Sequence, residues 1–185
     1  MREPEFIVYT GPMFGSKTTK MLSVLERCSY QNRRVIAFKP KMDARYSEGE
    51  ICTHAGLKFP AINVNTGKDI LDLSEEFDVI GVDEAFMIDD CAEALISLYK
   101  KGKTIVASSI QMSASGNIFT ELKEILPWAT KIEVCPAVCV KTGNNAYYTV
   151  RKVSNLSEIE VGGADMYEPR AWSSTPFINE CRDVD

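Results

Sequence analysis

One stretch of the sequence decides the fold: Phe6-Ile7-Val8-Tyr9-Thr10-Gly11-Pro12-Met13-Phe14-Gly15-Ser16-Lys17-Thr18. Its first five residues are β-branched or aromatic and stop at a Gly-Pro pair, which is typical of a buried strand that ends in a turn. From residue 17 to about residue 31 the apolar side chains recur at helical spacing, and residues 35–38 form another strand-like run. A strand, a helix and a strand in this order predict a βαβ unit and therefore a parallel sheet.

The turn within this stretch has the composition of a phosphate-binding loop. Such a loop needs a glycine after a strand, backbone N–H groups around the phosphate oxygens, a lysine, and a Ser or Thr hydroxyl for Mg²⁺. The candidate loop residues are Gly11, Pro12, Met13, Phe14, Gly15, Ser16, Lys17 and Thr18. Ser16 departs from the pattern, which has glycine before the lysine, and in a left-handed backbone its Cβ costs about 1–2 kcal/mol. We expect a phosphate site that Ser16 weakens or reshapes; the alternative is a glycine-rich strand–helix turn without a ligand.

Further apolar runs extend the sheet along the chain. Strands are predicted at residues 61–64, 77–82, 104–107 and 131–135, and helices at 91–101 and 118–126, whereas residues 39–58 read as a long polar loop. After residue 139 the pattern changes to hairpins: residues 138–140 and 147–150 flank a Gly-Asn-Asn turn. The sequence therefore predicts an α/β fold, with a P-loop (RecA-like) parallel sheet and flanking helices in residues 1–135. A small β-rich module is expected at residues 136–170 and a loosely held tail at 171–185.

A second chemical signal follows the strand at residues 77–82, where Asp83 and Glu84 stand side by side. In P-loop proteins an acid at such a strand end holds Mg²⁺. Because consecutive strand residues face opposite ways, the two acids are able to take different roles: Asp83 at the metal and Glu84 as a general base toward the substrate. The alternative is a strand end with two solvated carboxylates.

Composition and charge exclude several classes of protein. The chain has 185 residues, 45% of them hydrophobic and 25% charged, which is ordinary for a globular protein. Its net charge of −5 argues against a general nucleic-acid binder. We find no apolar run long enough for a membrane span and no signal-peptide layout, and the six cysteines do not indicate a disulfide framework. We expect a cytoplasmic protein with neither a nucleic-acid nor a membrane partner.

An ordered set of short motifs across residues 6–170 resembles the cytosolic-type (type II) thymidine kinase family. These motifs are Gly11-Pro12-Met13-Phe14, Lys17-Thr18-Thr19, Phe38-Lys39-Pro40, Asp43-Ala44-Arg45-Tyr46-Ser47, Thr53-His54-Ala55-Gly56, Asp83-Glu84-Ala85 and Val161-Gly162-Gly163-Ala164-Asp165-Met166-Tyr167-Glu168-Pro169-Arg170. The resemblance implies phosphoryl transfer from ATP to the 5′-hydroxyl of thymidine or deoxyuridine. It also implies a homotetramer and a small zinc-bearing module whose lasso closes over the nucleoside.

The resemblance also implies roles for individual residues. Lys17 and Thr18 would serve the donor phosphates and Mg²⁺, Asp83 would hold the metal, and Glu84 would be the base. The implied substrate contacts are Arg45 to phosphate, Met13 in the base pocket, and Gly162, Gly163 and Tyr167 in the lasso. ATP and Mg²⁺ are the implied cofactors.

Two departures bear on the nucleoside pocket: Phe86 replaces a glutamine of the family, and Ala114 stands where an aromatic residue would stack on the base. An ATP-dependent kinase with thymidine as acceptor is the favoured interpretation. One alternative is a catalytically impaired nucleotide-binding, nucleoside-binding or assembly protein of the same fold, and another is a kinase for a different nucleoside. A RecA-like motor is disfavoured because the acidic chain has no nucleic-acid footprint.

The zinc site that the resemblance implies is largely missing. Of four cysteine positions only Cys139 is retained, while Thr142, Ala171 and Ser174 occupy the other three. A structural zinc site needs four ligands, so we expect no structural zinc and a module held by packing or by subunit contacts.

Overall fold

The computed structural model describes residues 3–43, 49–53, 56–152 and 161–179. Its centre is a six-stranded sheet in the order β5-β2-β6-β7-β1-β8. These strands are β1 (Phe6–Gly11), β2 (Val35–Pro40), β5 (Ile62–Val64), β6 (Val79–Val82), β7 (Thr104–Ile110) and β8 (Lys131–Val134). Every neighbouring pair in this sheet is parallel, which confirms the predicted α/β class.

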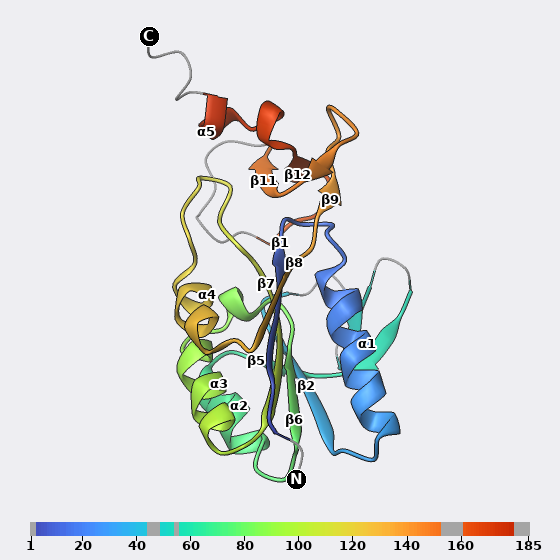
Figure 1. Cartoon of the computed structure of the whole chain (residues 1–185), viewed down its shortest axis with the longest axis vertical. Helices are drawn as coiled ribbons and strands as arrows, with labels where there is room; N and C mark the ends of the chain where they lie inside the picture. The colour runs from blue at the N-terminus through green and yellow to red at the C-terminus, as the bar shows by residue number, and fades with distance from the viewer. Residues whose placement is uncertain (1–2, 44–48, 54–55, 153–160, 180–185) are drawn as a thin grey trace.

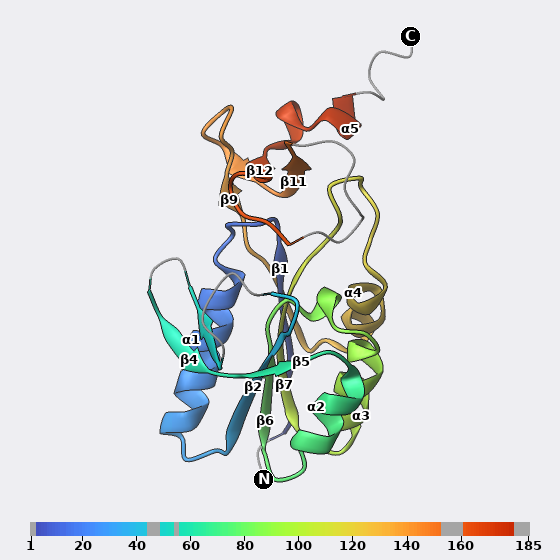
Figure 2. The same cartoon turned by 180° about the vertical axis from the view of Figure 1, so that it is seen from behind.

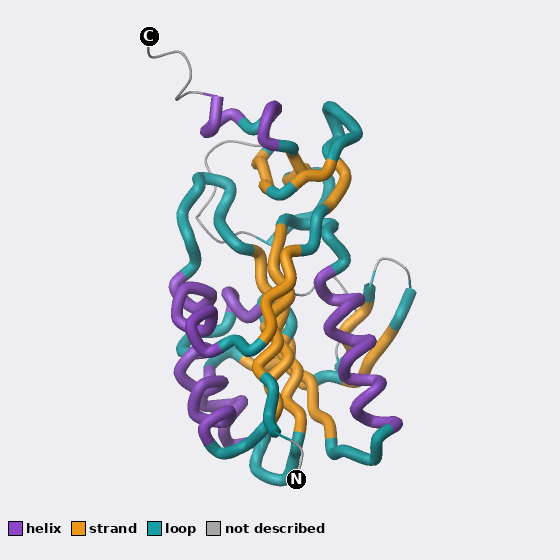
Figure 3. The backbone as a smooth tube through the Cα atoms, in the orientation of Figure 1, coloured by secondary structure: helices purple, strands orange, loops and turns teal. Residues whose placement is uncertain are grey.

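Helices cover both faces of the sheet (Figures 1 and 3). On one face lies α1 (Lys17–Tyr30), whose buried side chains Met21, Leu22 and Leu25 pack on the strands. The other face carries α2 (Gly67–Leu73), α3 (Cys91–Lys100) and α4 (Thr120–Ile125), which share a larger apolar core. No helix within the described ranges is both long and apolar enough to cross a lipid bilayer.

Two features differ from the sequence-based expectation. The predicted loop at residues 39–58 contains β3 (Glu50–Cys52) and ends at the first residue of β4 (Lys58–Pro60). These two strands form a hairpin and are too short to show a periodic pattern. Helix α2 was not expected either; its N-terminus is fixed by Thr66 and Asp69, which cap each other's backbone N–H groups.

A small module lies beyond the carboxyl ends of the central strands (Figures 1 and 2). It pairs β9 (Ala137–Val138) with β10 (Asn145–Ala146), and β11 (Tyr148–Arg151) with β12 (Tyr167–Arg170). The expected pairing of residues 138–140 with 147–150 is therefore wrong, because the second run pairs with β12 instead. A short turn at Trp172–Ser174 and α5 (Pro176–Asn179) follow.

The predicted start of the tail, at residue 171, falls inside the packing of this module. Ala171 and Thr175 are buried, and the Thr175 hydroxyl donates a hydrogen bond to the Ala171 carbonyl at 2.8 Å. Phe14, from the loop after β1, packs against a small apolar cluster of the module that includes Ala171. The Met13 N–H donates to Thr149 Oγ1 at 3.0 Å. The module is thus joined to the loop after β1. The division of the chain at residues 135 and 170 stays a prediction.

Candidate active site

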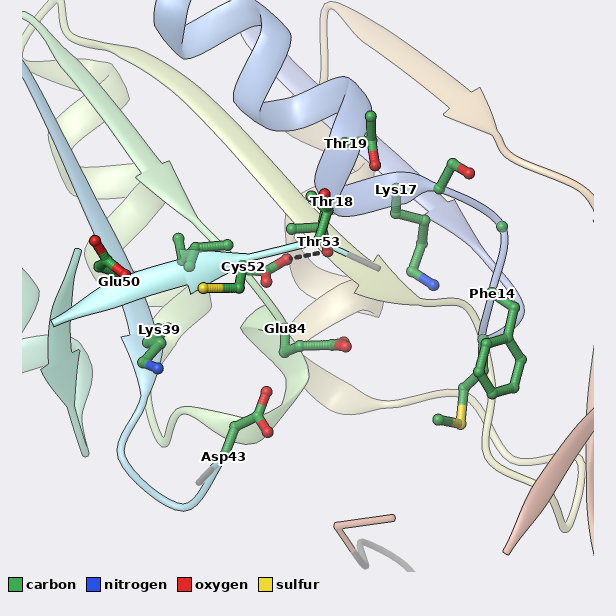
Figure 4. A pocket seen from close by; sticks show the side chains of 15 residues that line it. Phe14, Lys17, Thr18, Thr19, Lys39, Asp43, Glu50, Cys52, Thr53 and Glu84 are labelled. Carbon is green, nitrogen blue, oxygen red and sulfur yellow. Dashed lines mark hydrogen bonds between the residues drawn. The ribbon is translucent and has the colours of Figure 1, made fainter. Parts of the chain in front are cut away.

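A cavity of about 310 Å³ opens at the carboxyl end of the sheet (Figure 4). Its walls are residues 13–19, residues 50–53 of the β3–β4 hairpin, and four charged residues at or just beyond the ends of β2 and β6: Lys39, Asp43, Asp83 and Glu84. Ligands of parallel α/β proteins bind at this end of the sheet, because strand ends and helix N-termini meet there. The cavity is therefore the candidate active site.

The loop between β1 and α1 is pressed against the end of the edge strand. A Cβ at Gly11 or at Gly15 would lie 2.3 Å from the carbonyl oxygen of Cys135, closer than real Cβ atoms approach. Gly11 also has φ = +133°, which side chains rarely adopt. Both glycines are thus required by shape.

Ser16 adopts a left-handed conformation that glycine would adopt without steric cost, with φ = 60° and ψ = 24°. Its side chain is exposed and does not cap α1, and the first turn of α1 contains no acidic residue. The N-terminal N–H groups and the positive end of the helix dipole consequently face the cavity edge without a side-chain cap, which suits a phosphate.

Lys17 is buried, and its ammonium group bridges the loop by donating to the Pro12 carbonyl at 2.6 Å. An ammonium group has three donors, so Lys17 is able to keep this bond while it donates to a ligand oxygen. Figure 4 shows its side chain pointing into the cavity, toward the space that the Glu84 carboxylate faces.

Asp83 accepts hydrogen bonds from two hydroxyl groups of neighbouring elements. Thr18 Oγ1 donates to Asp83 Oδ1 at 2.9 Å (dashed in Figure 4), and Ser108 Oγ from β7 donates to the same oxygen. Burial and the neighbouring Glu84 charge raise the pKa of Asp83, while the two hydroxyl bonds and Lys17 act in the opposite direction. A bound cation at this carboxylate would favour its charged form.

Glu84 does not continue the strand. β6 ends at Val82, and Glu84 has φ = 50° and ψ = 47°, so its backbone is left-handed. Strand alternation does not set the directions of the two acids, because β6 ends before them, and both Asp83 and Glu84 line one cavity. Their different roles stay a prediction. The left-handed turn brings the second carboxylate round to the first, at a cost of about 1–2 kcal/mol.

The donor set fits the cofactors that the resemblance implies. Mg²⁺ prefers hard oxygen ligands, and Thr18 and Asp83 present a hydroxyl and a carboxylate next to each other. The loop shaped by Gly11 and Gly15, with Lys17 and the start of α1, offers N–H and ammonium donors for phosphate oxygens.

The structure brings most of the predicted site residues together. Met13, Phe14, Gly15, Ser16, Lys17, Thr18, Asp83 and Glu84 all line the cavity. Gly11 and Pro12 shape the loop from behind, and Arg45 lies outside the described residues. Gly162, Gly163 and Tyr167 do not line the cavity; Tyr167 is buried in the module, where the Arg151 guanidinium lies 5.6 Å from its ring.

Sequence reasoning assigned no role to three polar residues at this site. Lys39 and Asp43 are buried and line the cavity, and Ser108 contacts Asp83 from behind. Lys39 and Ser108 could have been found from the sequence, because each is a polar residue near the carboxyl end of a predicted parallel strand.

Phe86 points away from the cavity. It is buried against Phe119, with ring centroids 4.5 Å apart, and it does not line the cavity. Ala114 does not line it either. The Phe86 side chain is therefore part of the core and does not narrow the cavity.

The four positions of the implied zinc site meet around one sulfur atom. Cys139 Sγ and Ser174 Oγ are 3.2 Å apart. Burial opposes ionisation of this thiol, but hydrogen bonds from the Ser174 and Thr142 side chains and from the Ala171 and Lys141 backbones lower the Cys139 pKa to about 6. One thiol with hydroxyl neighbours does not fit a tetrahedral structural zinc site.

Taken with the parallel sheet, the phosphate loop and the paired acids define a P-loop protein of the phosphotransferase type. A family model described as thymidine kinase matches residues 5–172. A thymidine kinase of Thermococcus kodakarensis is 36% identical over 176 residues, covering 88% of this chain and 89% of the relative. A thymidine kinase of Pyrobaculum aerophilum is 33% identical, covering 89% and 94%, and one of Bacteroides thetaiotaomicron is 30% identical, covering 88% and 82%. The chain belongs to the thymidine kinase family.

Proposed function

We propose that this protein transfers the γ-phosphoryl group of ATP to the 5′-hydroxyl of thymidine. The observation that carries the proposal is the convergence of Lys17, the Thr18–Asp83 pair and Glu84 on one cavity at the start of α1. Membership of the thymidine kinase family supports the choice of nucleoside.

Phosphoryl transfer requires little covalent chemistry from the protein, so positioning and charge neutralisation dominate. Mg²⁺, when bound, neutralises charge on the transferred phosphoryl group. Thr18 and Asp83 are the residues that would hold it, and Lys17 and the α1 N-terminus donate to phosphate oxygens. Glu84 accepts the proton of the 5′-hydroxyl as that oxygen attacks the γ-phosphorus of ATP, whose bond to the β–γ bridging oxygen breaks and releases ADP.

Substrate contacts outside this centre are part of the same proposal. Met13 lines the cavity and would contact the base, Arg45 would contact phosphate, and Gly162, Gly163 and Tyr167 would close over the nucleoside.

We also propose a homotetramer, for which the exposed Ile132 and Val134 on the edge strand β8 provide apolar contact surface. Light scattering of the purified chain measures its mass directly, and a monomer at assay concentration would exclude the tetramer.

The test is an assay with labelled ATP, Mg²⁺ and a panel of deoxynucleosides. We expect thymidine monophosphate as the main product. Glu84→Gln should lower kcat by about 10²- to 10⁴-fold, the usual contribution of a general base, without weakening ATP binding. Glu93→Gln, at an exposed position of α3, is the matched control and should behave as the parent. Absence of any monophosphate, with Glu84→Gln indistinguishable from the parent, would reject kinase activity.

The left-handed Ser16 favours a second candidate, a protein that binds nucleotide or nucleoside without turnover. A strained phosphate loop would hold ATP in a geometry unsuited to transfer. Calorimetric binding of a non-hydrolysable ATP analogue together with no product in the assay above would select this candidate.

A further inference from the structure

Ser108 links the two acids of the site from behind. It lies on β7, next to β6 in the sheet, and its side chain is fully buried at 0% exposure. Its hydroxyl donates to Asp83 Oδ1 and accepts a hydrogen bond from the Glu84 N–H at 3.2 Å. One hydroxyl therefore contacts the side chain of one residue and the backbone of the next.

The direction of these bonds follows from the chemistry of the groups. The Glu84 backbone N–H is able only to donate, so the Ser108 oxygen accepts there. The single hydroxyl proton of Ser108 is then directed to the carboxylate oxygen of Asp83. The Ser108 contact consequently depends on Asp83 as an acceptor and on the left-handed backbone of Glu84, which is what presents its N–H to β7.

We infer that Ser108 is a positioning residue, which fixes the rotation of the Asp83 carboxylate and the left-handed turn at Glu84. Both hydroxyl donors, from Thr18 and Ser108, meet Oδ1 of Asp83, so Oδ2 is the oxygen that neither of them occupies. The same serine holds the turn that directs Glu84 into the cavity. This inference rests on the proposed function and adds to it a residue that touches neither substrate nor metal.

Burial of a serine on β7 does not by itself require its hydroxyl to hydrogen-bond with Asp83 and Glu84. The next residue, Ser109, is equally buried on β7, and its hydroxyl donates to the carbonyl of Ile110, within its own strand. Ser108 instead reaches across to the end of β6. Ser109 is thus a matched control: it has the same residue type, strand and burial, but its hydroxyl donates to Ile110 and to neither acid.

The experiment compares Ser108→Ala with Ser109→Ala by kinetics and by thermal unfolding. Loss of a hydrogen bond to a charged group weakens an interaction by about 10- to 100-fold. We expect Ser108→Ala to raise the Mg²⁺ concentration for half-maximal activity and to lower kcat by this range, with the KM for thymidine within twofold of the parent. A readout independent of turnover is the rise in unfolding temperature caused by Mg²⁺ with a non-hydrolysable ATP analogue, which should shrink in Ser108→Ala and persist in Ser109→Ala.

Equal behaviour of the two alanine variants would overturn the inference. If Ser108→Ala does not fold, Ser108→Cys replaces it, because a thiol fills similar space and is a weak donor; parent-like Mg²⁺ dependence in that variant would also overturn it. Failure of the proposed function is distinguishable: the parent would then make no thymidine monophosphate, while the thermal shift would still report the effect of Ser108 on the bound Mg²⁺ and nucleotide.

Discussion

Gly15 lies so close to the carbonyl of Cys135 that the two residues leave no room for a methyl group: a Cβ at position 15 would be 2.3 Å from that oxygen. The Cys135 backbone is itself held, because its N–H donates to the Thr10 carbonyl at 2.7 Å and continues the β1–β8 pairing. The shape of the phosphate loop is therefore set by an edge strand more than one hundred residues away in the sequence.

We expect Gly15→Ala to displace the loop. Neither the Cys135 carbonyl nor the Pro12 carbonyl, 3.3 Å from the same Cβ position, is on a flexible side chain that could move away. Overpacking of this kind costs about 1–3 kcal/mol in free energy of unfolding. Urea denaturation should show that loss, and calorimetry should show that binding of the ATP analogue is abolished.

Ser16→Ala is the control for this substitution. It places the same alanine one residue further along, at an exposed position that already carries a Cβ. We expect stability and ATP binding close to those of the parent. If both alanine variants bind ATP equally, the packing of Gly15 against Cys135 does not determine the loop.

Ser16→Gly should raise the stability and the ATP affinity that Gly15→Ala lowers. The left-handed backbone costs a residue with a Cβ about 1–2 kcal/mol, whereas glycine adds about 0.5–1 kcal/mol of backbone entropy on folding. The net change is a gain of up to about 1.5 kcal/mol in the free energy of unfolding, and ATP affinity should improve by about tenfold or less. Ser16→Ala retains the Cβ and should show neither change. Unchanged ATP affinity in Ser16→Gly would show that the strain at residue 16 does not limit binding.

The sequence was sufficient to predict the parallel sheet, because its strands are continuous apolar runs separated by helical patterns. It also singled out Lys17, Thr18 and Asp83, which the structure brings to one cavity, because they carry recognisable chemistry at strand ends; their roles stay predictions. The β3–β4 hairpin was missed because three-residue strands have no measurable period, and α2 because its seven residues give a weak signal that depends on the Thr66–Asp69 cap.

The orientation of Glu84 lay beyond sequence reasoning for a different reason. Alternation along a strand places neighbours on opposite faces, but β6 stops one residue before Asp83 and the chain turns left-handed at Glu84. Nothing local in the sequence indicates that turn. It is held by Ser108, 24 residues further along, whose partner becomes visible only when β6 and β7 are side by side.

The Cys139 thiol should titrate near pH 6, well below an ordinary thiol. Because the folded pKa lies below the unfolded value of about 8.5, its stabilisation is fully present above about pH 8.5 and is lost as pH falls through about 6. The free energy of unfolding should therefore rise from pH 6 to pH 8.5 in the parent, relative to Cys139→Ser. Thiolate absorbance at 240 nm and denaturation at several pH values measure the two effects.

Cys91→Ala is the control for this titration. Burial in α3 raises the pKa of the Cys91 thiol, so its removal should leave the low-pH absorbance step intact. Persistence of that step in Cys139→Ser would assign it to another group and would contradict the role of the Ser174 and Thr142 hydrogen bonds.

We expect the positions around Cys139 to bind zinc when cysteines replace their present residues. Thr142, Ala171 and Ser174 surround the Cys139 sulfur, so the triple substitution Thr142→Cys, Ala171→Cys, Ser174→Cys would place four thiols at one point. Four thiolates bind zinc tetrahedrally and contribute their binding free energy to folding. We expect about one zinc per chain and a higher unfolding temperature that a chelator reverses, while the parent and the triple variant that also carries Cys139→Ser should hold no stable zinc. A folded triple variant without zinc would show that the four positions do not converge as described, and zinc in the parent would contradict the expectation of no structural zinc.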